Sequence, residues 1–98
     1  MIKVIKKGNH IDIKGHALFD KYGKDIVCAA VSSIVITTVN GILSIDDEAI
    51  KYSDSVGYVS IDILKDDKVV NLLILNMINL LKELEVQYEK NIKVEEVD

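Results

Sequence analysis

Residues 25–42 have the sequence DIVCAAVSSIVITTVNGI, and the structure of this segment decides the fold class of the chain. Its β-branched middle locally favours a strand. About 17 residues without a turn signal are, however, too long for a typical buried strand, and apolar side chains recur at helical spacing. Asp25 is a suitable N-cap, and Asn40-Gly41 is a suitable C-terminal stop. We therefore predict a helix from Asp25 to about Ile42, buried on nearly all sides because it is apolar nearly all round.

A β-hairpin is predicted before this helix. Gly8 and Asn9, which tolerate positive φ, lie between runs of alternating apolar residues at 1–6 and 11–15. His10 then lies at or near the turn, where we expect a solvated side chain rather than a second catalytic group.

A second hairpin is predicted after the helix. Its strands are expected at 43–51 and 56–64, around a turn at 52–55. Residues 59–63 alternate between apolar and polar side chains, which indicates one buried and one wetter face.

The sequence pattern of the C-terminal third predicts a second helix and a last strand. Asp66-Asp67 caps a helix that extends to about Tyr88. The apolar stripe of this helix consists of Val69, Leu72, Leu73, Met77, Leu80, Leu81 and Leu84. Residues 92–97 add a short strand. The element order ββαββαβ implies a single α+β domain over residues 1–98, with two helices packed on a small, mostly antiparallel sheet.

Composition and charge narrow the classes of function. The chain has 12 basic and 16 acidic side chains, a net charge of −4, so direct nucleic-acid binding is not expected. The one cysteine excludes an internal disulfide framework and fits a reducing cytosol. No apolar run reaches the roughly 18 residues of a membrane span, and the first residues lack a signal-peptide core. We expect a cytoplasmic protein that does not contact the membrane.

Cys28, the only cysteine, lies in the first turn of the predicted helix. Backbone N–H groups there have no partner within the helix, and the helix dipole favours an anion, so the pKa of a thiol is lowered toward the reactive thiolate. Taken alone, a cysteine among Ile, Val and Ala is usually a small core residue. The chain adds His16 as a base at a strand end and a glycine-containing loop between the two residues. This combination predicts a Cys–His nucleophilic site.

Four groups of residues carry a family resemblance: Gly15-His16-Ala17, Gly23, the run DIVCAAVS at 25–32, and Asn40-Gly41. Together they resemble the ribosomal-processing cysteine protease family (Prp). The resemblance implies a cytoplasmic bacterial endopeptidase, usually homodimeric, with a ribosomal protein precursor as its peptide substrate. It further implies that the enzyme trims the N-terminal extension of large-subunit ribosomal protein twenty-seven, cutting after an aromatic pair and before a small residue.

The resemblance also assigns roles to individual residues. Cys28 would be the nucleophile, and His16 the general base and later the general acid. Backbone N–H groups of the first helical turn would form the oxyanion hole. Asp25 matches the family motif and either orients His16 or simply caps the helix. Ser32, one helical turn beyond Cys28, either donates a hydrogen bond near the thiolate or packs as a small residue.

The loop before the helix has apolar side chains that a loop does not normally expose. Leu18, Phe19 and Tyr22 lie there together with Gly23, which gives the backbone freedom. These residues either close over an aromatic substrate segment, as an active-site lid does, or hold the loop against the core.

Other classes of function remain open. A non-enzymatic dimeric interaction module in ribosome assembly would use the second helix and a sheet edge as binding surfaces, but it has no need for the His16/Cys28 pair. A redox-sensing thiol is a weaker option because the chain has no second cysteine to resolve a sulfenic acid. One cysteine and one suitable histidine do not fill a four-coordinate zinc site, so we expect neither a metal nor a cofactor.

Overall fold

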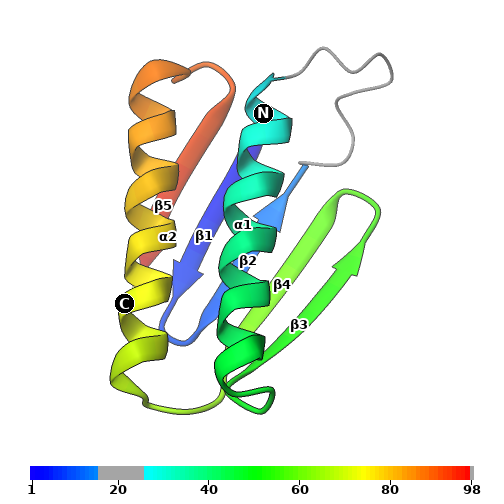
Figure 1. The fold of residues 1–98 in the computed structure, drawn as a ribbon. Coiled ribbons are helices and arrows are strands. Elements are labelled where there is room, and N and C mark those ends of the chain that lie inside the picture. Colours follow the sequence, from blue (N-terminus) through cyan, green and yellow to red (C-terminus); the bar gives the residue numbers. More distant parts are fainter. Residues whose placement is uncertain (16–25, 98) are drawn as a thin grey trace.

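The computed structural model describes residues 1–15 and 26–97, which form two helices and five strands (Figure 1). In chain order these are β1 (Ile2–Lys7), β2 (His10–Lys14), α1 (Ile26–Ile45), β3 (Ile50–Ser55), β4 (Tyr58–Ile63), α2 (Lys68–Gln87) and β5 (Ile92–Val97). The predicted α+β class and the element order ββαββαβ are confirmed.

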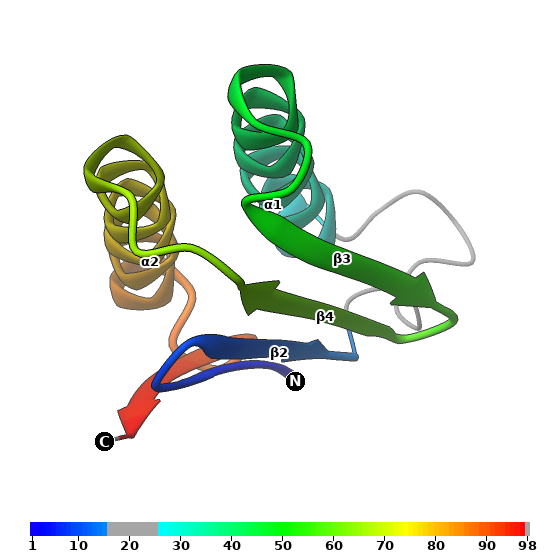
Figure 2. The ribbon, with the colours of Figure 1, turned by 90° about the horizontal axis from the view of Figure 1, so that it is seen from below.

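The strands form one mixed sheet in the order β3-β4-β2-β1-β5. The pairs β1–β2, β2–β4 and β3–β4 are antiparallel, whereas β1 and β5 are parallel. Both helices lie on the same side of the sheet, as the view from below shows, in which the helices are seen nearly end-on (Figure 2). The prediction of two helices on a small, mostly antiparallel sheet is therefore confirmed.

The hydrophobic core lies between the two helices and one face of the sheet. Side chains alternate along each strand, so Ile11 and Ile13 of β2 are buried in the core while His10 and Asp12 point to the opposite, open face. No polar or charged side chain among the described residues is buried. This apolar core fixes the positions of the elements that lead into and out of the candidate site.

Helix α1 extends to Ile45, so the predicted stop at Asn40-Gly41 was wrong. A glycine that ends a helix usually takes a positive φ, but Gly41 is not among the glycines that do so. The helix continues because Ile42 is fully buried in the core, and the N–H of Asp46 still donates to the carbonyl oxygen of Ile42 at 2.9 Å. Core packing therefore outweighs the local stop signal.

The burial of α1 is also more one-sided than predicted. The buried residues Val27, Val31, Val35, Val39 and Ile42 form a single stripe, whereas Ile26 and Ile45 are 62% and 60% exposed. By length and composition α1 is apolar enough to cross a membrane, contrary to the expectation that no segment would be. The core helix of a soluble protein passes the same test, and the valine stripe of α1 packs in the core described above.

The second hairpin is present, but its turn lies later than predicted. Residues 43–45 belong to α1, and the predicted turn at 52–55 is part of strand β3. Ser55 pairs with Tyr58, which leaves a two-residue turn at Val56-Gly57. Gly57 has φ +74°, and it is the second central residue of the turn, a position where the type II turn requires positive φ and favours glycine.

Helix α2 has the predicted start and end. Its N-cap is Asp67, whose carboxylate accepts hydrogen bonds from the N–H groups of Val69 and Val70 at 2.9 and 3.0 Å. The predicted stripe is confirmed only in part. Met77 and Leu81 are buried and Leu73 and Leu84 pack against the core, but Val69, Leu72 and Leu80 are exposed. The other buried residues of α2 are Val70, Ile74 and Ile78. The helix is apolar on two faces, and its position between α1 and β5 selects which one is buried.

Candidate active site

Cys28 lies in the first turn of α1, as predicted, at the third residue of the helix. The first N–H groups of an α-helix have no acceptor within the helix, and the positive end of the helix dipole lies there. The Cys28 side chain is half-buried and packs against the hydrophobic core. The thiol is therefore held by the core at a place where backbone donors favour a thiolate.

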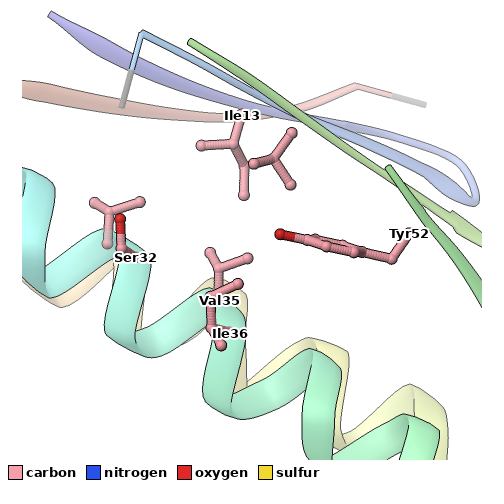
Figure 3. Close-up of a pocket in the computed structure, with 7 residues that line it drawn as sticks. Ile13, Ser32, Val35, Ile36 and Tyr52 are labelled. Atoms are coloured by element: carbon pink, nitrogen blue, oxygen red, sulfur yellow. The ribbon is translucent and has the colours of Figure 1, made fainter. Parts of the chain in front are cut away.

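Ser32 lies one helical turn after Cys28, so the two side chains share a side of α1. It is half-buried and lines a pocket between α1 and the sheet. Figure 3 shows its side chain on the side of α1 that faces the sheet, at one edge of the pocket that Ile13 and Val35 also line. The two alternatives for Ser32, a hydrogen bond near the thiolate and close packing, both fit this position and stay predictions.

The remaining predicted site residues lie outside the described residues: His16, Leu18, Phe19, Tyr22, Gly23 and Asp25. The pairing of His16 with Cys28 and the lid function of the loop are therefore not tested by the structure. The elements that flank this segment are described. The end of β2 and the start of α1 lie at the same end of the molecule (Figure 1).

Gly15, the last described residue before His16, is held by the second hairpin. Its N–H donates a hydrogen bond of 2.7 Å to the carbonyl oxygen of Gly57. Gly15 itself has φ +90°, a conformation that favours glycine. The turn of the β3–β4 hairpin thus determines the point from which the chain enters the segment that contains His16.

His10 is part of a hydrogen-bonded cluster that the sequence analysis missed. Its Nδ1 lies 2.5 Å from Asp62 Oδ1 and its Nε2 lies 2.9 Å from Asp12 Oδ1, while the hydroxyl of Tyr58 donates to Asp12 at 2.5 Å. The hydrogen bond with Asp62 raises the pKa of His10 despite the opposing effect of burial, and Asp12 adds to the increase. With both nitrogens against carboxylates, the ring suits the imidazolium form, which has two N–H donors.

This cluster belongs to the open face of the sheet, away from the helices and from Cys28. The alternation of His10 and Asp12 with Ile11 and Ile13 indicates the shared face in the sequence. The pairing of His10 with Asp62, by contrast, depends on the β2–β4 neighbourhood, which the sequence pattern does not reveal. The cluster links strands and is no part of the candidate active site.

Within residues 1–15 and 26–97, one group of acidic residues is close enough to hold a metal ion. Asp46, Asp47 and Glu48 bring three carboxylate oxygens within 4.8 Å of one another after the end of α1. Asp46 already pairs with Lys65 at 2.8 Å, which lowers the pKa of the Asp46 carboxyl. Exposed acidic groups of this kind are common without an ion, so the cluster by itself indicates no metal site.

Comparison with known proteins connects this geometry with a family. The sequence profile of the family described as "Cysteine protease Prp" matches residues 1–93. The ribosomal processing cysteine protease Prp of Staphylococcus aureus is 33% identical over 100 residues, which cover 95% of this chain and 92% of the relative. The protein of the same name from Mycoplasma genitalium is 40% identical over 55 residues, covering 56% of this chain and 52% of that one.

Solved structures with a similar fold include proteins with the same name. A crystal structure of S. aureus Prp in complex with a substrate peptide superposes with a TM-score of 0.87 at 26% identity, covering 98% of this chain and 99% of that one. A second one, with a covalently linked product peptide, gives 0.84 at 30% identity and the same coverage. The profile match spans nearly the whole chain, and the fold agrees with it. This chain is a cysteine protease of the Prp family.

Proposed function

We propose that this chain is an endopeptidase that removes the N-terminal extension of large-subunit ribosomal protein twenty-seven, with Cys28 and His16 as its catalytic dyad. The observation that carries the proposal is the position of Cys28, the only cysteine, in the first turn of α1 in a chain of the Prp family. The S. aureus relatives bound to a substrate peptide and to a covalently linked product support a peptide substrate.

The proposed reaction follows the chemistry of a thiol nucleophile. His16 accepts the proton of the Cys28 thiol, and Sγ attacks the carbonyl carbon of the scissile bond. N–H groups of the first turn of α1 stabilise the oxyanion of the tetrahedral intermediate. When the C–N bond breaks, His16 returns the proton to the leaving amine and a thioester remains on Cys28. Water, activated by His16, then hydrolyses the thioester and restores the thiol.

The central experiment compares the unaltered protein with the variant Cys28→Ala. Each is incubated with a peptide that spans the N-terminal extension of the ribosomal protein from the same organism, and products are identified by mass spectrometry. We expect one cut, after an aromatic pair and before a small residue, and none with Cys28→Ala. The matched control is Ser33→Ala, a small substitution at an exposed position of the same helix, which should leave cleavage unchanged.

The outcomes separate the proposal from its alternative. Cleavage by a folded Cys28→Ala variant would exclude Cys28 as the nucleophile. A protein that binds the peptide or the ribosomal protein without cutting either would instead be the non-enzymatic interaction module. Circular dichroism of each variant verifies that a loss of cleavage is not a loss of fold.

We further propose that the protein acts as a cytoplasmic homodimer. Apolar side chains on the outer faces of the helices, such as Ile26 and Ile36 of α1 and Leu72 and Leu75 of α2, support a protein surface that is covered by a partner. Light scattering coupled to size-exclusion chromatography measures the molar mass directly. Fractionation of cells into soluble and membrane material tests the location, and recovery in the membrane fraction would contradict it.

A further inference from the structure

The open face of the sheet collects lysine side chains. Residues that alternate with the buried ones point to this face, and both described helices lie on the other side (Figure 2). The charged side chains of the open face, apart from His10, are Lys3, Lys7, Lys14, Lys51 and Lys93, with Asp12, Asp62 and Glu95. Positive charge is therefore in excess here, although the whole chain has a net charge of −4. Our expectation of no nucleic-acid contact rested on that net charge, which does not describe this face.

Three of these lysines stand side by side across three strands. Lys3 of β1 is in register with Lys14 of β2 and with Lys93 of β5, and we call the three the lysine row. Neighbouring strands are roughly 4.8 Å apart, so the row is about 10 Å long. Like charges directly opposite one another destabilise a sheet. Lys93 lies 3.5 Å from Glu95, but in the described part of the chain no carboxylate forms an ion pair with Lys3 or Lys14. An external anion would remove this repulsion.

Tyr58 continues the row on the next strand. It is in register with Lys14, and its side chain is partly exposed on the open face. The Tyr58 hydroxyl donates a hydrogen bond of 2.5 Å to Asp12, which holds the ring on this face. Exposed aromatic rings of this kind stack on unpaired nucleic-acid bases. The open face thus combines a line of cations with one aromatic ring at its end.

This combination favours a single-stranded nucleic acid over other anions. A line of cations matches the repeating charge of a phosphate backbone. Bases within a duplex are already stacked on one another, whereas those of a single strand are free to stack on an aromatic side chain. An acidic peptide would also pair with the lysine row, but its carboxylates would gain nothing from the ring of Tyr58.

We propose that the open face of the sheet binds a single-stranded nucleic acid, with the lysine row on its phosphates and the Tyr58 ring on one of its bases. Cys28 packs against the core on the other side of the sheet, so this binding requires neither the thiol nor cleavage. The proposal goes beyond the proposed protease function and does not depend on it.

The test measures the fluorescence anisotropy of short labelled single strands, one of RNA and one of DNA with the same mixed sequence, at several salt concentrations. Three phosphate contacts predict a slope of about −2 when the logarithm of the binding constant is plotted against that of the salt concentration. Binding of either strand supports the proposal, and the ratio of the two affinities identifies the preferred form.

Three variants separate the two kinds of contact. Lys3→Gln and Lys14→Gln should each weaken binding roughly five-fold at low salt and make the slope shallower by about 0.7, because each removes one phosphate contact. Tyr58→Leu should weaken binding by roughly five-fold or more and leave the slope unchanged, because a stacking contact releases no counterions.

The matched control is Lys68→Gln, which removes the same charge from an exposed position at the start of α2. It should bind like the unaltered protein. Circular dichroism of every variant verifies the fold. Two competitors test the choice of ligand: a glutamate-rich peptide with the same number of charges and a duplex of the same sequence, both expected to bind at least ten-fold more weakly.

Each contrary result overturns the proposal. These results are no binding at low salt, an equal loss in Lys68→Gln and Lys3→Gln, and tighter binding of the duplex. Equally tight binding of the acidic peptide would assign the lysine row to an acidic protein partner instead. None of them bears on the protease function, which is measured by peptide cleavage, so the failure of one proposal is distinguishable from the failure of the other.

Discussion

The backbone N–H of Gly15 donates a 2.7 Å hydrogen bond to the carbonyl oxygen of Gly57, and this bond joins the end of β2 to the turn of the β3–β4 hairpin. Both residues have positive φ, +90° for Gly15 and +74° for Gly57. Two glycines distant in sequence thus set the position of the backbone directly before His16.

The Gly57→Ala variant tests whether this junction matters for catalysis. A side chain at φ +74° strains the backbone by roughly 1–2 kcal/mol, and the turn will shift to relieve it. We expect lower stability in urea unfolding and a decrease in kcat/KM larger than the loss of folded protein explains. Gly8→Ala is the matched control, because Gly8 has φ +58° in the other hairpin turn and open space around its Cα. It should lose similar stability and keep its activity; equal activity in both variants would contradict a positioning function.

Stability should depend on pH through His10. The pKa of His10 is raised above its ordinary value of 6.5 in the folded protein, chiefly by the hydrogen bond with Asp62. A protonated His10 with a raised pKa stabilises the fold fully at pH values below 6.5. This contribution is lost as the pH rises through the pKa that His10 has in the folded protein. We expect the free energy of unfolding to decrease by less than about 1 kcal/mol as the pH rises above 6.5, because the ring is partly exposed. His10→Asn should remove this dependence, and a slope that persists in the variant would assign it to another group.

Asp12 affects stability at low pH, and with the opposite sign. Partial burial alone would raise it, but hydrogen bonds from Tyr58 and His10 outweigh burial and lower it. This carboxyl therefore stabilises the fold above its ordinary pKa of 3.8, and the contribution disappears as the pH falls through the folded value. The decrease above pH 6.5 is consequently a signature of His10 and not of Asp12.

Cys28 should be more reactive than an ordinary thiol. Its place in the first turn of α1 exposes it to backbone donors and to the positive end of the helix dipole, which favour the thiolate. We expect iodoacetamide to alkylate Cys28 in the folded protein at pH 7 faster than it alkylates a peptide that contains the same residue. Labelling in 6 M urea provides the internal comparison. Equal or slower labelling of the folded protein would identify Cys28 as an inert core cysteine.

Two isoleucines near the end of α1 test the continuation of the helix beyond Gly41. Ile42 is 0% exposed and Ile45 is 60% exposed. Ile42→Ala should cost about 2–5 kcal/mol because it removes buried methyl groups and leaves a cavity, whereas Ile45→Ala should change stability by less than about 0.5 kcal/mol. Denaturant unfolding of the pair measures both. Similar values would place the end of the helix at the predicted stop.

The sequence predicted what depends on local pattern and length. The segment that contains Cys28 was predicted to be a helix because it is too long for a buried strand, and the structure describes a helix there from Ile26 onward. The same helix ends at Ile45 rather than at about Ile42, because core packing outweighs the local stop signal at Asn40-Gly41. The apolar stripe of α2 was predicted only in part for a related reason, since α2 has apolar residues on two faces.

The candidate site was predictable in its chemistry but not in its surroundings. Cys28 was predicted to be the nucleophile because it is the only cysteine and lies near the predicted start of a helix. The pocket that Ser32 and Tyr52 line was not predicted, because Tyr52 was placed in a turn. The alternation of Ile50 and Tyr52 with Lys51 and Ser53 is nevertheless typical of a strand. The His10 cluster required knowledge of which strands are neighbours, and that order is a property of the whole sheet.

The parallel pairing of β1 with β5 has a consequence for how the protein is made. Ile2 pairs with Ile92, so strand β1, which is synthesised before the other described strands, has to wait for β5. Contacts between such distant residues form late in folding because the closure of a long loop costs entropy. Until β5 pairs with it, β1 has an open strand edge that can pair with strands of other chains. A chain that lacks β5 should therefore aggregate, which limits protease activity to molecules that contain this strand.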